Sequence, residues 1–258
     1  LDYVDQKQVD TVVSLLGGIS NVQHYNPAEF AWQFSRMFRA RCYLITAPAI
    51  VDSIETKSAL IERCGIGGSF AISETLDAVL LSVGGVQSDR IPGAPDYISE
   101  STRRELVRAG AVGNVLYNYF DAAGDLVDHP LNTRVMSVPL ANLRKTPERI
   151  LASGGTEKVA ALRGAMALLQ PTVLITDEVL AVGDESFQRK CIAWMERYLS
   201  HGGTLLLCSH SMYHIQKLCS HAAWIHDGQL KRLGPALDVT REYIAWHERK
   251  SAGETAAA

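Results

Sequence analysis

The stretch Ser153–Asp184, SGGTEKVAALRGAMALLQPTVLITDEVLAVGD, decides how this chain folds. A glycine pair and a lysine open it, an apolar helical run follows, and Val173–Thr176 is a short β-rich segment. The carboxylates of Asp177 and Glu178 stand where such a strand would stop. A helix that leads into an apolar strand is the repeating unit of a parallel α/β sheet, so we expect this fold class for the chain.

The position of the two carboxylates indicates a ligand site. In a parallel α/β sheet, ligands bind at the carboxyl ends of the strands. There Asp177 could hold a hydrated magnesium ion and Glu178 could polarise a water molecule. Alternatively, Asp177 only caps the helix that follows. The strand and the carboxylate pair alone do not decide between these two interpretations.

The rest of the sequence alternates strands and helices. Upstream, we predict strands at Val9–Leu16, Cys42–Thr46, Asp77–Val83, Val115–Phe120, Val135–Val138 and Ile150–Ala152, and helices at Pro27–Arg39, Ser53–Cys64, Ser69–Leu76, Ser99–Ala109 and Thr146–Arg149. Downstream, we predict helices at Glu185–Leu199, Met212–Cys219 and Pro235–Glu248, a strand at Gly203–Cys208, and a hairpin of Ala222–Ile225 with Gln229–Leu233. This alternation predicts a doubly wound, mainly parallel sheet in three α/β/α layers.

Composition sets the broad class of the protein. The 258 residues are 47% hydrophobic and 21% charged, which is typical of a soluble globular chain of one or two domains. A net charge of −3 argues against non-specific nucleic-acid binding. The five cysteines form no Cys-x-x-Cys pair and are expected to be reduced, and no apolar run reaches the length of a membrane span. We therefore expect a cytoplasmic protein.

The upstream part of the chain carries a series of short motifs. Between Val9 and Gly164 these are VVSLLGGISN, ITAPAIVDS, DAVLLSVGG, GAVGNVLYNYFDAAG, HPLNTRVMSVPL and ILASGGTEKVAALRGA. This part resembles the sugar-binding effector domain of SorC/DeoR-type transcriptional regulators. The resemblance implies a sheet related to phosphosugar isomerases and a sugar or sugar phosphate as ligand. The helix-turn-helix of such regulators and the first strand–helix unit of their effector domain have no counterpart here, so no DNA contact is expected.

The residues expected to bind a sugar phosphate follow predicted strands. Gly154, Gly155 and Lys158 open a helix, where backbone N–H groups and a lysine favour an anion. The alternative is a strand–helix turn that needs glycine, with the lysine in solvent. The other candidates are Gly84, Gly85, Asp121, Asn132 and Arg134. The glycines allow close backbone approach or form a turn, and Asp121 is at least as well explained as a turn residue.

A second resemblance covers about Ala165–Glu248. The string DEVLAVGD, followed by FQRK, resembles the Walker B motif and D-loop of ABC-type ATPases that export polysaccharide, O-antigen or teichoic acid. It implies Asp177 as the magnesium ligand, Glu178 and His210 as catalytic residues, and Asp184 in the D-loop. The glycine pair after Ser153 can also be compared with the ABC signature loop, but its AxGGxxK form fits the sugar-binding family better.

The phosphate-binding loop of an ATPase is missing from this sequence. Its nearest candidate, Cys64–Ser69, lacks the lysine that holds the phosphates. We therefore expect no ATP hydrolysis, and we assign no cofactor with certainty. Mg-ATP would be the cofactor only if the chain were instead the ATP-binding subunit of an exporter. In that alternative the partner is the transmembrane subunit of the exporter. The sequence does not decide whether the chain forms a homo-oligomer.

The two resemblances together predict a hybrid. Residues 1–164 would be a non-catalytic carbohydrate-binding domain, 165–250 the carboxyl half of an ABC ATPase, and 251–258 a disordered tail. A third hypothesis is a hybrid fold that binds no ligand. If the parts share a core, Ile150–Ala152, Val173–Thr176 and Leu205–Cys208 should lie in one parallel sheet. The glycine pair and Asp177 would then lie at the same edge.

Overall fold

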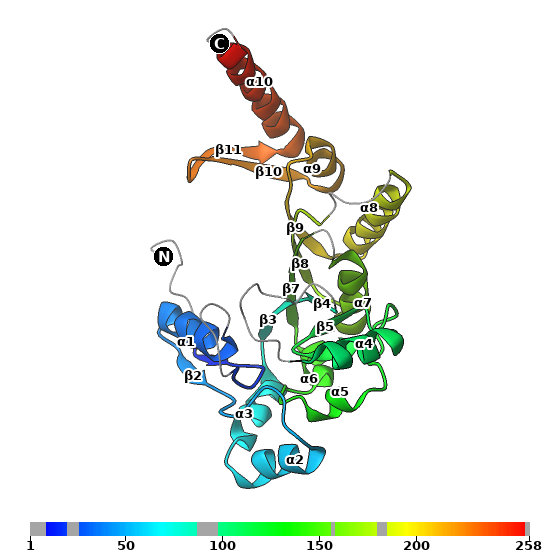
Figure 1. Ribbon diagram of the computed structural model, residues 1–258. Helices are drawn as coiled ribbons and strands as arrows, with labels where there is room; N and C mark the ends of the chain where they lie inside the picture. The colour runs from blue at the N-terminus through cyan, green and yellow to red at the C-terminus, as the bar shows by residue number, and fades with distance from the viewer. Residues whose placement is uncertain (1–8, 20–25, 87–97, 156–157, 180–184, 256–258) are drawn as a thin grey trace. The chain divides into compact units, whose positions relative to one another are not determined.

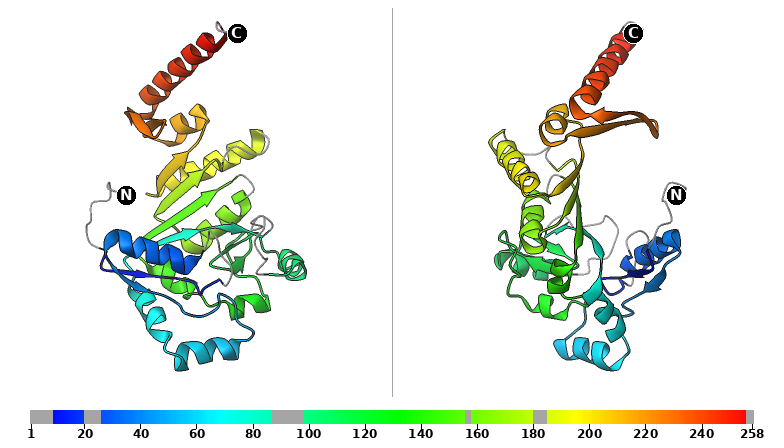
Figure 2. Two further views of the ribbon diagram at one scale, coloured as in Figure 1. Left: turned by 60° about the vertical axis from the view of Figure 1, so that its left-hand side comes forward. Right: turned by 180° about the vertical axis from the view of Figure 1, so that it is seen from behind.

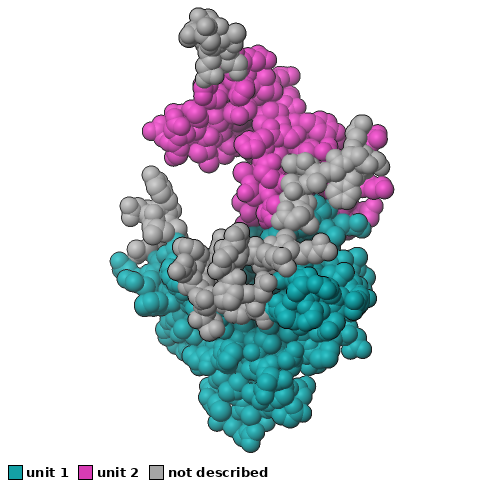
Figure 3. Space-filling view, viewed as in Figure 1, with its two compact units in different colours: residues 1–153, 157–172 teal, residues 154–156, 173–258 magenta. Residues whose placement is uncertain are grey.

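The computed structural model describes residues 9–19, 26–86, 98–155, 158–179 and 185–255, and Figures 1 and 2 trace its elements in chain order. The chain divides into two compact units. Unit 1 comprises residues 1–153 and 157–172, and unit 2 comprises residues 154–156 and 173–258 (Figure 3). The division predicted at residue 164 remains a prediction. No helix among the described residues is long and apolar enough to cross a membrane.

Unit 1 begins with a strand–helix–strand element. Strands β1 (Thr11–Val13) and β2 (Arg41–Tyr43) pair in parallel, and α1 (Pro27–Phe38) connects and contacts them (Figure 1). Asn26 caps α1 by accepting a hydrogen bond from the Ala28 N–H at 3.0 Å, and proline occupies the first turn. The helix was predicted within one residue because both signals are visible in the sequence.

Next come α2 (Ile54–Arg63), α3 (Gly67–Ile72), a short 3₁₀ helix (Ser73–Thr75) and strand β3 (Ala78–Ser82). Strand β3 pairs in parallel with β7 (Glu148–Gly154), with Ala78 opposite Glu148 and Ser82 opposite Ala152. Between β3 and β7 the chain forms α4 (Glu100–Arg108), α5 (Pro130–Arg134) and α6 (Leu140–Lys145). The helix predicted at Thr146–Arg149 is wrong, because the helix ends at Lys145 and Glu148 already belongs to β7.

A small antiparallel sheet corrects two strand predictions. It consists of β4 (Gly84–Gly85), β5 (Gly113–Val115) and β6 (Asn118–Phe120). The strand predicted at Val115–Phe120 is therefore the second half of a tight hairpin. The strand predicted at Val135–Val138 forms isolated bridges instead, to Leu16 through Ser137 and to Ile50 through Val135.

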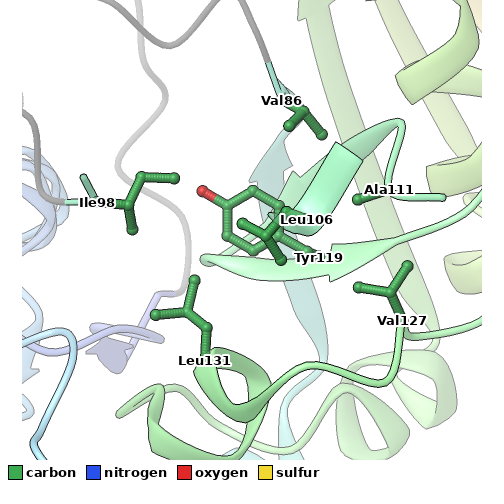
Figure 4. Close-up of a cluster of buried hydrophobic side chains, with 7 residues drawn as sticks. All are labelled: Val86, Ile98, Leu106, Ala111, Tyr119, Val127 and Leu131. Atoms are coloured by element: carbon green, nitrogen blue, oxygen red, sulfur yellow. The ribbon is translucent and has the colours of Figure 1, made fainter. Parts of the chain in front are cut away.

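The core of this region lies between α4, the hairpin and α5. Its buried members come from separated segments and converge around the ring of Tyr119 (Figure 4): Val86, Ile98, Leu106, Ala111, Tyr119, Val127 and Leu131. Helix α7 (Val159–Leu169) is mostly apolar and buries Leu162, Ala165 and Leu169 almost completely. A Cβ added to Gly164 would lie 2.6 Å from the Asp121 carbonyl oxygen, so α7 approaches the end of β6 too closely for any larger residue.

Unit 2 continues with parallel strands. Strand β8 (Val173–Asp177) pairs with β9 (Thr204–Cys208), as predicted, with Val173 opposite Thr204 and Asp177 opposite Cys208. Helices α8 (Glu185–Ser200) and α9 (Met212–Leu218) flank β9 in the sequence. Strands β10 (His221–His226) and β11 (Gln229–Pro235) form the predicted hairpin.

One face of the hairpin packs on helix α10 (Ala236–Thr255), where Trp224 contacts the rings of Tyr243 and Trp246. The opposite face exposes the side chains of Ile225, Leu230 and Leu233. Helix α10 extends to Thr255, and the disordered tail expected over residues 251–258 stays a prediction. Residues 256–258 lie outside the described part of the chain.

The protein is a mixed α/β protein with a parallel four-stranded sheet, whose strand order is β3-β7-β8-β9. The predicted α/β class with a parallel sheet is therefore confirmed, and the doubly wound arrangement in three layers stays a prediction. Strand β7 contributes to both units, because Glu148–Ser153 fall in unit 1 and Gly154 falls in unit 2. All five cysteines are free thiols, and among them Cys191 alone is buried.

Candidate functional site

The end of β7 carries a buried hydroxyl next to the glycine pair. Ser153 is 7% exposed, and its Oγ atom has no hydrogen-bond partner among the described residues. Gly155 follows with a φ of 86°, a backbone conformation that glycine adopts without strain. Its N–H group donates to the Asp177 carbonyl oxygen at 3.2 Å, so the glycine pair and Asp177 lie together as predicted.

Helix α7 begins directly after this turn. Lys158 is its N-cap residue, is half-buried, and makes no side-chain capping bond to the helix. The N–H groups of an uncapped first turn carry partial positive charge, and a lysine beside them adds a full one. Thr156 and Glu157 lie outside the described residues. The described residues of this segment thus include a buried hydroxyl, a glycine with positive φ and a lysine, and their role in binding a sugar phosphate stays a prediction.

Asn132, a predicted ligand residue, is engaged with the backbone. Its Nδ2 donates to the carbonyl oxygens of Tyr119 at 3.0 Å and Val127 at 2.8 Å, and its Oδ1 accepts from the Tyr119 N–H at 2.8 Å. Asp121 forms a turn, since its Oδ1 accepts from the N–H groups of Ala123 at 2.9 Å and Asp125 at 3.0 Å. These bonds support structural roles for both side chains, and their ligand roles stay predictions.

The remaining upstream candidates lie on α5 and in the small sheet. Arg134 donates from Nε to the Pro130 carbonyl oxygen at 3.3 Å. A hydrogen bond from Thr56 lowers the pKa of the Asp52 carboxyl group, and the positive charge of Arg134 contributes to this shift. Gly84 and Gly85 pair with β5 opposite Asn114 and Gly113, so they act first as strand residues.

At the ends of β8 and β9 the side chains bind each other. Glu178 has a φ of 53°, and its N–H group donates to the Cys208 carbonyl oxygen at 3.1 Å. Its Oε1 accepts from the His210 N–H at 3.0 Å, and the His210 Nε2 lies 3.8 Å from the same oxygen. A hydrogen bond to Asp177, together with partial burial and nearby negative charge, raises the pKa of the Cys208 thiol. The side chain of His210 is 92% exposed.

His214 lies on α9, close enough to Glu178 to feel its charge. It is 6% exposed, its Nδ1 has no partner among the described residues, and burial lowers its pKa against the opposing effect of Glu178. Within the described residues, no group of three or more His, Cys, Asp or Glu side chains is placed to hold a metal ion. Asp184, the predicted D-loop residue, lies outside the described residues.

Sequence reasoning missed a convergence of loops in unit 1. The Gly18 N–H donates to the Ala47 carbonyl oxygen at 2.7 Å, and the Gly17 N–H donates to that of Met136 at 2.8 Å. A Cβ on Gly17 would lie 2.6 Å from the Ala47 oxygen. The glycine pair was a usable signal, but in the sequence it indicated only the end of a strand.

The family of the chain follows from comparison with known proteins. Residues 2–182 match the family model described as "Putative sugar-binding domain". The chain belongs to this sugar-binding domain family. Its match over 169 residues to the "Deoxyribonucleoside regulator" of Bacillus subtilis is 29% identical and covers 65% of this chain and 53% of that protein. The effector-domain resemblance to SorC/DeoR-type regulators is thus confirmed.

Solved structures of sugar-binding domains share the fold. A domain of a possible sugar-binding transcriptional regulator from Arthrobacter aurescens TC1 is 26% identical, with a TM-score of 0.56 and 64% coverage of both chains. The full-length sorbitol operon regulator SorC from Klebsiella pneumoniae has a TM-score of 0.59 at 17% identity and covers 74% of this chain and 61% of SorC, which shows the fold alone.

A second set of relatives matches about a third of the chain. The teichoic acids export ATP-binding protein TagH of Levilactobacillus brevis is 38% identical over 89 residues, which is 33% of this chain and 25% of TagH. The O-antigen export system ATP-binding protein RfbB of Klebsiella pneumoniae is 36% identical over 97 residues, which is 38% of this chain and 39% of RfbB. The chain thus spans a quarter to about half the length of these curated relatives.

Proposed function

We propose that this chain is a non-catalytic effector module that binds a sugar phosphate. The family match supports the sugar, and the turn at the end of β7 supports the phosphate. The proposed ligand contacts are Gly154, Gly155 and Lys158, with Arg134 and the Gly84-Gly85 strand as further candidates. In a relative that regulates transcription, such a module would pass the presence of a sugar to the rest of the protein.

The observation that carries the proposal is the buried hydroxyl of Ser153, which has no hydrogen-bond partner among the described residues. A buried polar atom without a partner costs free energy, and such atoms are rare in native proteins. This one stands directly before two glycines and five residues before Lys158, the N-cap residue of α7. A phosphate oxygen or a sugar hydroxyl would supply the missing bond, and the lysine would balance the charge of a phosphate.

Calorimetric titration of the whole chain tests the proposal. The probes are ribose 5-phosphate, 2-deoxyribose 5-phosphate, glucose 6-phosphate, fructose 6-phosphate and the matching free sugars. We expect at least one phosphorylated sugar to bind, and Lys158→Met to weaken it about ten- to a hundredfold, since a hydrogen bond to a charged group contributes about 1.5–3 kcal/mol. The matched control is Lys145→Met, which removes an exposed lysine at the end of α6.

A folded sample that binds none of the phosphorylated sugars at millimolar concentration would refute the proposal. Equal losses of affinity in Lys158→Met and Lys145→Met would refute the phosphate site, because that result reports only the net charge of the protein.

We further propose that the ABC-like segment, residues 165–250, is inherited from an exporter ATPase and is inactive here. The second candidate function is the ATP-binding subunit of a polysaccharide exporter, with Mg-ATP as cofactor and a transmembrane subunit as partner. The pairing of β8 with β9, which brings Glu178 and His210 together, favours it. A phosphate-release assay decides: turnover that vanishes in Glu178→Gln would establish the second function, and we expect no turnover in either protein.

A further inference from the structure

Strand β9 is the last strand of the four-stranded sheet. The strand order is β3-β7-β8-β9, so β8 pairs with one edge of β9, and within the described part of the chain no strand pairs with the other edge. The free N–H and C=O groups of such an edge are a template for another strand. An open edge of this kind is either protected by its own residues or paired with a second strand.

The residues of β9 do not protect its open edge. Natural edge strands usually carry charged side chains or proline, or are bent by a bulge. The segment from Gly202 to Ser209, GGTLLLCS, contains neither a charge nor a proline, and β9 pairs with β8 without a shift in register. The side chain of Leu206, at the centre of the strand, is 51% exposed. By contrast, the charged Asp77 directly precedes β3, the outermost strand on the other side.

The pairing with β8 shows which backbone groups point to the open edge. The Cys208 carbonyl oxygen accepts from the Glu178 N–H at 3.1 Å, so the backbone groups of Cys208 point toward β8. Successive residues of a strand direct their backbone groups to opposite edges. The groups of Leu206 therefore also point toward β8, and those of Leu205 and Leu207 point to the open edge.

We propose that β9 pairs with β9 of a second copy of this chain, antiparallel about a two-fold axis that passes through Leu206. Leu205 then exchanges its backbone hydrogen bonds with Leu207 of the second copy, and Leu206 lies opposite its own counterpart. The sheet continues across the axis from one copy into the other. This inference concerns a different surface from the sugar phosphate site and does not depend on it.

The side chains that would meet on the exposed face favour a second copy as the occupant. Thr204, Leu206 and Cys208 are the exposed residues of β9. In the antiparallel pair Leu206 faces Leu206, and Thr204 faces Cys208 of the second copy. None of them is charged, so two identical strands place no like charges opposite each other. A surface that pairs with itself about a two-fold axis is the commonest arrangement in homo-oligomers.

The mass of the whole chain in solution, measured by light scattering after size-exclusion chromatography over a range of concentrations, tests the proposal. Because a pair of short strands forms a small interface, we expect a dimer that dissociates at micromolar concentration. Leu206→Lys places two lysines opposite each other and should raise the dissociation constant about tenfold or more. The matched control is Leu80→Lys, at the centre of β3, where the leucine is 43% exposed, and this variant should dimerise as the parent does.

A disulfide locates the axis. Leu206→Cys, in a protein that also carries Cys208→Ser, brings two thiols together across the axis. Directly opposite residues of a pair without mutual hydrogen bonds have Cα atoms about 4.5 Å apart, which is within the range of a disulfide. Mild oxidation should therefore give a covalent dimer in non-reducing electrophoresis, whereas Leu80→Cys in the same Cys208→Ser protein should give none.

Three results would overturn the inference. The first is a parent protein that stays monomeric up to millimolar concentration. The second is a dimer that Leu206→Lys leaves intact, or that Leu80→Lys weakens to the same extent, while circular dichroism shows both variants to be folded. The third is a dimer in light scattering that Leu206→Cys does not link on oxidation, because the contact then lies elsewhere. The proposed sugar phosphate site is unaffected by any of these results.

Discussion

Replacing Gly164 with alanine tests the packing of α7 against the small antiparallel sheet. An alanine Cβ at this position would lie 2.6 Å from the Asp121 carbonyl oxygen and 2.8 Å from two atoms of the Phe120 ring. Real Cβ contacts are essentially never this short, and the first neighbour is backbone. Phe120 is fully buried, so its ring has little room to move aside. Either α7 or the end of β6 must shift.

The expected change in stability is the difference of two effects. Alanine in place of glycine within a helix contributes about 1 kcal/mol of stability. Overpacking of a dense core costs about 1–3 kcal/mol, and contacts this short belong at the upper end of that range. We expect Gly164→Ala to lower the free energy of unfolding by about 1–2 kcal/mol. For a chain of this size the melting temperature would fall by about 2–8 °C.

Gly68→Ala is the matched control. Gly68 lies in α3, and a Cβ there would have no atom within 4 Å. Only the gain in helix propensity then acts, so we expect the melting temperature to rise by about 2–4 °C. Thermal unfolding followed by circular dichroism measures both variants. A Gly164→Ala protein that melts at or above the parent temperature, beside a Gly68→Ala protein that behaves as expected, would show that α7 does not approach β6 as described.

Substitutions at three further positions give distinct outcomes. Burial lowers the pKa of His214, so the stability that the neutral imidazole contributes is lost as the pH falls below the unfolded-state pKa of about 6.5. In a series of thermal melts, His214→Asn should therefore reduce the change in melting temperature between pH 7 and pH 5. Glu178→Ala should cost about 1 kcal/mol in denaturant titration because the His210 N–H loses its acceptor, whereas Glu178→Gln, which keeps an acceptor, should cost less. Asn132→Ala should lower the denaturation midpoint by an amount equivalent to about 2 kcal/mol through three lost hydrogen bonds, and unchanged stability with weaker sugar binding would instead support a ligand role.

The sequence predicted the elements whose signals are local. Helix α1 has an asparagine cap and a proline in its first turn, and β8 is an apolar run that ends in two carboxylates. These features act within a few residues, so they could be placed almost to the residue. The neighbouring positions of β8 and β9 followed from the resemblance to ABC ATPases, in which these two strands are adjacent.

The failures have a common physical cause. The two central residues of the turn, Leu116 and Tyr117, are neither glycine nor asparagine, so no local signal predicts it. Asn118 holds the turn in place through a hydrogen bond to Ser137, which is distant in the sequence. The segment at Val135–Val138 is apolar like a strand, yet it pairs with loops through single bridges. In both cases tertiary contacts overrode local propensity, and a single sequence does not reveal those contacts.

Among the candidate site residues, the glycine pair and Asp177 could be placed at one edge because their strands are adjacent in the sheet. The hydrogen bonds of Asn132 and the missing partner of Ser153 depend on backbone groups whose positions no motif encodes. Sequence therefore indicated where a site should lie better than it indicated which side chains are available for a ligand.

The hairpin of β10 and β11 has a consequence for handling the protein in solution. Ile225, Leu230 and Leu233 are 66%, 58% and 65% exposed on one face, and Ile225 stands directly opposite Leu230. A two-stranded ribbon has unpaired backbone along both outer edges, which favours edge-to-edge aggregation of concentrated samples. A charged residue on that face, as in Ile225→Lys, would oppose aggregation and raise the concentration at which the protein stays in solution.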